Sequence, residues 1–89
     1  SAVDFPEVTL PRLSSDTRLL HVHENRPGML KAINDTIGVS AANIDAQYLR
    51  TLDDVGYVVT DVAIEREAGL ALGEELRRLP GTLRSRVLF

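Results

Sequence analysis

His21-Val-His-Glu-Asn-Arg-Pro-Gly28 is the stretch of this 89-residue sequence that constrains the fold most. Its alternating first half predicts a strand with both histidines on one face. Pro27 and Gly28 predict a short loop that opens a helix, because proline is tolerated at the first helical position. Polar side chains of the loop then meet the free N–H groups of a helix N-terminus, which suits a small anion such as a carboxylate. The stretch is more typical of an amino-acid receptor than of a catalytic site.

The pattern around this stretch predicts four strands and two helices. In the first strand, Leu20 and Val22 fall on one face and Leu19, His21 and His23 on the other. Asp53-Asp54 predicts the turn of a hairpin, and Gly73 weakens the second helix because glycine is a poor helix former. The predicted strands cover residues 19–23, 43–48, 56–62 and 82–89, and the helices cover 27–37 and 68–79. The predicted buried positions of the helices are Leu30, Ile33, Ile37, Leu72, Leu76 and Leu79.

The element order is β-α-β-β-α-β, which predicts an α+β fold of the ferredoxin-like type. We expect an antiparallel four-stranded sheet with both helices on one face. Residues 17–89 form this domain, and residues 1–16, which contain Pro6 and Pro11, are interpreted as an extended arm or linker. Uncovered sheet edges invite pairing, so we expect a homodimer joined through a sheet edge.

Composition narrows the function classes. Thirteen acidic residues against ten basic ones give a net charge of −3, which argues against nucleic acid as a partner. There is no cysteine for a disulfide scaffold or a thiolate zinc site, which fits a cytoplasmic protein. No apolar run is long enough to span a bilayer, and no signal peptide is visible. Because the sequence begins at Ser1 without methionine, we expect a piece of a longer protein.

The segment His23-Glu-Asn-Arg-Pro-Gly-Met-Leu30 resembles the opening motif of an ACT domain, a small ligand-binding module of amino-acid metabolism. The resemblance is closest to the C-terminal regulatory domains of D-3-phosphoglycerate dehydrogenases and covers nearly the whole chain. It is carried by Phe5-Pro-Glu-Val, His21 to Gly28, Asn43-Ile44, Gln47-Tyr48-Leu49, Gly56-Tyr-Val-Val and Pro80-Gly-Thr-Leu-Arg-Ser-Arg. None of these segments is specific alone, but their joint order and spacing are.

The resemblance implies a function and a set of site residues. Members of this family oxidise 3-phosphoglycerate with NAD in the first committed step of serine synthesis, and their ACT domains are the feedback sensor. Two such domains join their sheets side by side, within a parent that can be a tetramer, and L-serine binds across the seam. By this resemblance, His23 and Asn25 contact serine from one chain, Gly28 lets the ligand approach the backbone, and Asn43 reaches it from the other chain. NAD belongs to the catalytic part, so we expect no cofactor, metal or catalysis in this chain.

One position departs from the family pattern. ACT domains often carry glycine two positions before this asparagine, whereas this chain has Ala41. If the position requires a positive φ angle, alanine is strained there and the reach of Asn43 changes.

Other functions remain as alternatives or are excluded. The chain could be a dimerisation module without a ligand, or a sensor of another small amino acid. His21 and His23 with Glu24 lack a clear third ligand on their face, which makes a poor metal site. An acylphosphatase-like activity is excluded because this sequence lacks the glycine-rich loop that such enzymes have. An RNA-binding domain would need two or three stacking aromatic residues on its central strands, and only Tyr57 is available.

Overall fold

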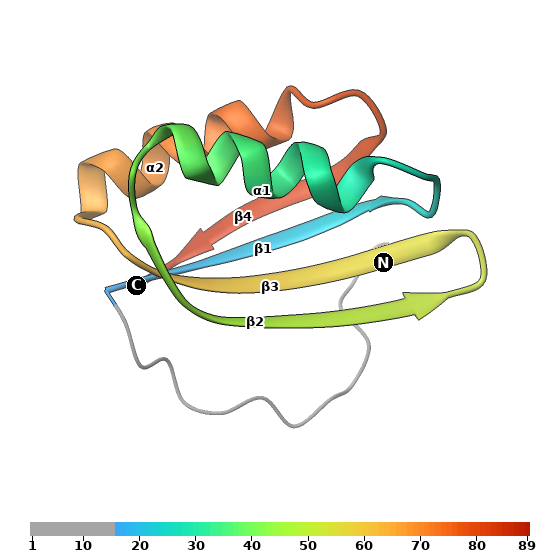
Figure 1. Cartoon of the computed structure of the whole chain (residues 1–89), viewed down its shortest axis with the longest axis horizontal. Helices are drawn as coiled ribbons and strands as arrows, with labels where there is room; N and C mark the ends of the chain where they lie inside the picture. The colour runs from blue at the N-terminus through green and yellow to red at the C-terminus, as the bar shows by residue number, and fades with distance from the viewer. Residues whose placement is uncertain (1–15) are drawn as a thin grey trace.

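The computed structural model describes residues 16–89 and has the predicted β-α-β-β-α-β order. Figure 1 shows one antiparallel sheet with both helices on a single face, in the strand order β2-β3-β1-β4. The elements are β1 (Thr17–Glu24), α1 (Met29–Val39), β2 (Asn43–Leu52), β3 (Val55–Ala63), α2 (Arg66–Arg77) and β4 (Thr82–Leu88). The predicted ferredoxin-like fold is therefore confirmed. The predicted arm lies outside the described residues, apart from Asp16.

The core lies between the helices and the sheet. The face of β1 that carries Leu19 points toward the helices, and Leu19 packs in a cluster with residues of both helices and of β3. That cluster consists of Leu19, Ile33, Ile37, Val58, Val62, Leu72 and Leu76. The alternation predicted for β1 is confirmed, because His21 is on the same face as Leu19 and its ring reaches the carbonyl of Leu76 on α2.

The start of α1 differs from the prediction. The helix begins at Met29 instead of Pro27, after Gly28 as its N-cap with φ of 89°. Its buried residues are Met29, Ile33 and Ile37, whereas Leu30 is 37% exposed. The prediction of Leu30 in the core is wrong because spacings of three and four residues both keep side chains on one helix face. Packing against the sheet selects the stripe of four-residue spacing, and Leu30 is turned toward β2.

The second helix is displaced toward the N-terminus of its predicted range. It spans Arg66–Arg77 instead of 68–79. It ends early because Leu79 precedes Pro80, and a residue before proline is disfavoured in helical conformation. The N–H of Leu79 binds the carbonyl of Leu76 at 3.2 Å, in a tighter turn, and its side chain still packs against the core. Leu72 and Leu76 are buried as predicted.

Gly73 allows α2 to lie close to β4. A Cβ atom at Gly73 would overlap the Cγ2 methyl of Val87, which is on β4 and is stiff because valine is branched at Cβ. The glycine that weakens the helix therefore serves its packing against the sheet.

We expect Gly73→Ala to lower the free energy of unfolding by about 1–3 kcal/mol, as for other overpacked cores. Urea denaturation at pH 7 measures this effect. Gly38→Ala is the matched control, because a Cβ there meets no atom within 4 Å. Alanine should stabilise α1 slightly at that position. An unchanged stability of Gly73→Ala would show that the helix can shift away from β4 at no cost.

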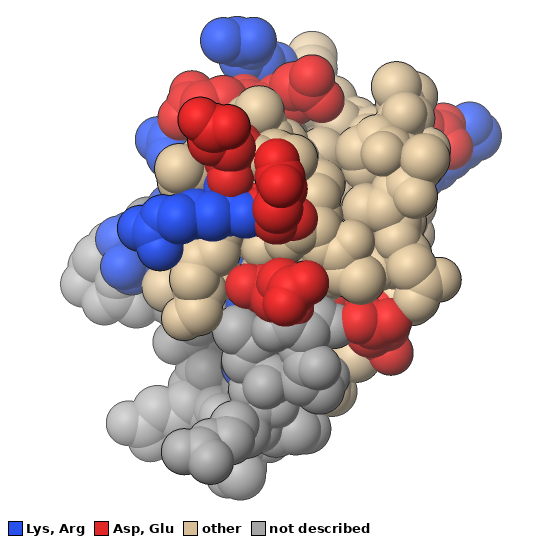
Figure 2. All heavy atoms as spheres, turned by 90° about the vertical axis from the view of Figure 1, so that its left-hand side faces the viewer, with Lys and Arg blue, Asp and Glu red and all other residues tan. Residues whose placement is uncertain are grey.

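Charged side chains are unevenly distributed on the surface. Figure 2, viewed from the end of the sheet where α2 begins, shows acidic side chains gathered over one part of that face, with an uncharged area beside them.

Among the described residues, no helix is long and apolar enough to cross a membrane.

Candidate functional site

The candidate site is a pocket of about 200 Å³ between the end of β1, the start of α1 and the edge strand β2. This volume is below the range of about 300–1,000 Å³ that is usual for sites of drug-sized ligands. It is lined by His23, Asn25, Arg26, Gly28, Met29, Leu30, Leu49, Arg50, Thr51, Gly56, Tyr57 and Val58. The structure therefore brings together three of the four predicted site residues, which are His23, Asn25 and Gly28.

The chain reaches the pocket through a short, well-bonded loop. After β1, the backbone N–H of Asn25 donates to the carbonyl of Asp54 at 2.8 Å, which ties the loop to the turn between β2 and β3. The side chain of Asn25 donates through Nδ2 to the carbonyl of Asp53 at 3.2 Å. These bonds hold Asn25 at the mouth of the pocket and leave its Oδ1 as an acceptor for a bound ammonium or hydroxyl group.

The N-terminus of α1 supplies backbone donors at the same place. Gly28 has the positive φ angle that favours glycine, and no side chain caps this end of the helix. The first turn also contains no acidic residue. Free N–H groups and the positive end of the helix dipole favour an anionic group near Gly28.

His23 is the most buried polar group of the pocket. His23 is only 7% exposed, and the Nδ1 atom of its ring has no hydrogen-bond partner among the described residues. Burial lowers the pKa of His23 below its ordinary value, so the ring is neutral at pH 7 and offers one donor and one acceptor. The unpartnered Nδ1 has almost no surface accessible from the pocket, whereas Nε2 lies over Gly56, which lines the pocket.

His21 has a structural role. Its Nε2 lies 2.9 Å from Oγ1 of Thr82, and that hydroxyl donates to the carbonyl of Leu76 at 3.0 Å. Since the hydroxyl has a single proton, Nε2 of His21 must be the donor to Thr82. Desolvation by burial lowers the pKa of His21 to about 4. His21 therefore joins β1 to the end of α2 and the start of β4 and does not line the pocket.

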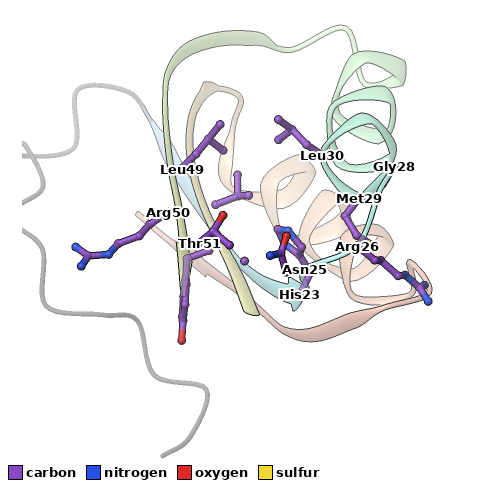
Figure 3. A pocket seen from close by; sticks show the side chains of 12 residues that line it. His23, Asn25, Arg26, Gly28, Met29, Leu30, Leu49, Arg50 and Thr51 are labelled. Atoms are coloured by element: carbon purple, nitrogen blue, oxygen red, sulfur yellow. The ribbon is translucent and has the colours of Figure 1, made fainter. Parts of the chain in front are cut away.

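The apolar wall of the pocket consists of Leu30 from α1 and Leu49 from β2, which face each other in Figure 3. The same view shows His23 and Asn25 close together, while the guanidinium groups of Arg26 and Arg50 point away from the cavity. Arg26 forms an exposed ion pair with Glu24, its Nη1 lying 3.4 Å from the carboxylate.

Asn43 lies away from this pocket within one chain. It is the first residue of β2, whereas Thr51 in the pocket is near the end of that strand. The two residues are eight positions apart, which corresponds to about 26 Å at about 3.3 Å per residue. The exposed side chain of Asn43 donates to Oδ1 of Asp45 at 2.6 Å. Ala41, two positions before Asn43, has a φ angle of 59°. The position where ACT domains often carry glycine therefore does require a positive φ angle in this chain, and alanine is strained there.

Sequence reasoning did not single out Leu30, Leu49, Thr51 or Gly56 as pocket residues. A glycine or leucine in a strand carries no signal of its own, and the residues that face His23 depend on the pairing register of β1, β2 and β3.

Among residues 16–89, no group of three or more His, Asp or Glu side chains could hold a metal ion.

Comparison with known proteins agrees with this architecture. The family model described as the AHAS small subunit-like ACT domain matches residues 19–84. The chain belongs to the ACT domain family. In fold, this ACT domain is similar to the crystal structure of the ACT domain from the GTP pyrophosphokinase of Chlorobium tepidum. The TM-score is 0.71 at 22% identity, over 81% of this chain and 95% of that one.

Curated relatives are more similar to this chain in sequence than the protein of that crystal structure is. This ACT domain is 45% identical over all 89 residues to the D-3-phosphoglycerate dehydrogenase of Escherichia coli (strain K12), covering 22% of that protein. It is 47% identical over 89 residues to the D-3-phosphoglycerate dehydrogenase of Haemophilus influenzae, covering 21% of it. The chain thus spans about a fifth of the length of these relatives.

Proposed function

We propose that this chain is the regulatory ACT domain of an NAD-dependent D-3-phosphoglycerate dehydrogenase and that it binds L-serine where two copies of the domain meet. Binding there would give feedback control of serine synthesis, a cytoplasmic pathway, by its end product. The carrying observation is a small pocket that brings His23, Asn25 and Gly28 together beside the exposed edge strand β2.

The chemistry of the pocket supports an amino acid as the ligand. The start of α1 near Gly28 suits the carboxylate, and the oxygen of Asn25 suits the ammonium group. The neutral ring of His23 can donate to or accept from the ligand. A short side chain is favoured because the pocket, which has Leu30 and Leu49 as its apolar wall, has a volume of only about 200 Å³. A site that hydrogen-bonds the serine hydroxyl would reject alanine, because its polar groups would lose their partners.

The geometry of β2 supports a site shared by two chains. Within residues 16–89 this edge strand pairs only with β3, and its Leu49 is 57% exposed. Antiparallel pairing with β2 of a second copy, centred between Gln47 and Tyr48, would place Asn43 of one chain opposite Leu52 of the other. The start of one β2 strand, which carries Asn43, would then lie beside the end of the other β2 strand, which carries the pocket residue Thr51.

Isothermal titration of the 89-residue chain with L-serine tests the proposal, with the dimeric state checked in the same buffer. D-serine, L-alanine and glycine are the controls. We expect saturable heat from L-serine alone or far above the controls. If another small amino acid gives saturable heat instead, the chain is a sensor of that amino acid. If a confirmed dimer gives no heat with any of them, the result favours a dimerisation module without a ligand.

Two asparagine variants test the site assignment. We expect Asn25→Ala and Asn43→Ala each to weaken L-serine binding by about 0.5–1.5 kcal/mol, and by more where a buried partner is stranded. Thr36→Ala is the control, because the Thr36 hydroxyl donates to the carbonyl of Ala32 within α1 and Thr36 does not line the pocket. Unchanged titration curves in both site variants would rule out this assignment.

A further inference from the structure

A row of three residues crosses the sheet beneath the pocket. In the strand register, Gly56 on β3 is paired with His23 on β1 and with Thr51 on β2. All three residues line the pocket. The middle position of the row has no side chain, so space is left over β3 between the backbones of His23 and Thr51.

The ring of His23 fills the space that a side chain on Gly56 would occupy. A Cβ atom at Gly56 would overlap Nε2 of His23 and would lie 2.8 Å from Cε1 and 3.0 Å from Cδ2. The three nearest atoms are thus all at the outer edge of the same ring. The backbone of Gly56 does not have a positive φ angle, so the close approach of His23 is the reason for glycine that the structure offers.

We propose that Gly56 is a positioning residue, which acts by making room for the His23 ring over β3 and thereby directing it into the ligand pocket. Since β3 lies between β1 and β2, a ring that starts on β1 reaches the pocket only by passing over β3. With a side chain at position 56, the ring has to turn away from Thr51, and the pocket loses the Nε2 atom that lies over Gly56. The part of this inference that concerns the ligand rests on the proposed function.

Thermal unfolding tests the contact without any ligand. We expect Gly56→Ala to lower the Tm by at least about 4 °C, the shift that corresponds to the lower end of overpacking effects in a domain of this size. In a His23→Ala background the same substitution should change the Tm by less than about 2 °C, because the overlapping ring is gone. If Gly56→Ala alone does not fold, His23→Ala/Gly56→Ala should still do so. An equal loss of Tm in both backgrounds would overturn the proposal.

Titration with L-serine tests the consequence for the site. Gly56→Ala should weaken binding at least about tenfold in the wild-type background and less than about twofold in the His23→Ala background. Gly38→Ala, which adds a methyl group away from the pocket, should leave binding unchanged. A tenfold loss in both backgrounds would mean that Gly56 does not act through His23. If the wild-type dimer does not bind L-serine, the proposed function fails, while the unfolding experiment still decides whether Gly56 positions His23.

Discussion

Arg18→Ala is expected to lower the free energy of unfolding by about 3–5 kcal/mol, the usual result of removing one partner of a buried ion pair. Arg18 donates to both carboxylate oxygens of Asp61, from Nε at 2.7 Å and from Nη2 at 2.9 Å. The two residues are paired across β1 and β3, and Asp61 has no exposed surface. Without the guanidinium group, the Asp61 carboxylate would be left as a buried charge. Because domains are stable by only about 5–15 kcal/mol, much of the fold's stability would be lost.

Urea denaturation of the 89-residue chain at pH 7 measures this loss. Arg18→Met/Asp61→Leu is the informative companion variant, because replacing a whole buried pair by apolar residues is often neutral or stabilising. Lys31→Gln breaks the exposed pair that Lys31 forms with Asp35 on α1 and should have little effect. If Arg18→Ala is as stable as Lys31→Gln, water reaches the Asp61 carboxylate and the pair is not effectively buried.

The second large effect is a loss of stability in mild acid. The pKa of His21 is about 4 in the folded chain, against an ordinary value of 6.5. Between these values the unfolded chain takes up a proton at His21 and the folded chain does not, so a falling pH favours unfolding. The contribution of His21 is complete above pH 6.5 and is lost as the pH falls toward 4. A difference of this size corresponds to about 3 kcal/mol. Burial also lowers the pKa of His23, which adds to the effect in the same direction.

His21→Gln isolates this contribution, because glutamine can still donate to Thr82 but does not titrate. We expect the stability of the wild-type chain, followed by urea denaturation from pH 7.5 to 4, to fall more steeply than that of the variant below pH 6.5. Both proteins carry the same carboxylates, so the difference between the curves reports His21. Parallel curves would show that the His21 ring can accept a proton inside the folded domain.

The resemblance to ACT domains predicted the residues of the candidate site, and their spacing in the sequence explains why one pocket contains three of them. His23, Asn25 and Gly28 are separated by at most five residues, and the end of a strand followed by a helix N-terminus holds them together. The strain at Ala41 was also foreseeable from one departure from the family pattern. Asn43 is different, because its place in the site depends on a second chain and stays a prediction.

The sequence by itself determined the type and order of the elements, because hydrophobic periodicity, proline and glycine act over a few residues. Only the tertiary structure decided which apolar stripe of α1 is buried, because Leu30 and Met29 satisfy the same periodicity. It also decided that Arg18 binds Asp61 and that Gly56 lies under His23. These contacts join residues more than thirty positions apart. They depend on strand register and on the rotation of helices against the sheet, which close packing of the whole domain selects.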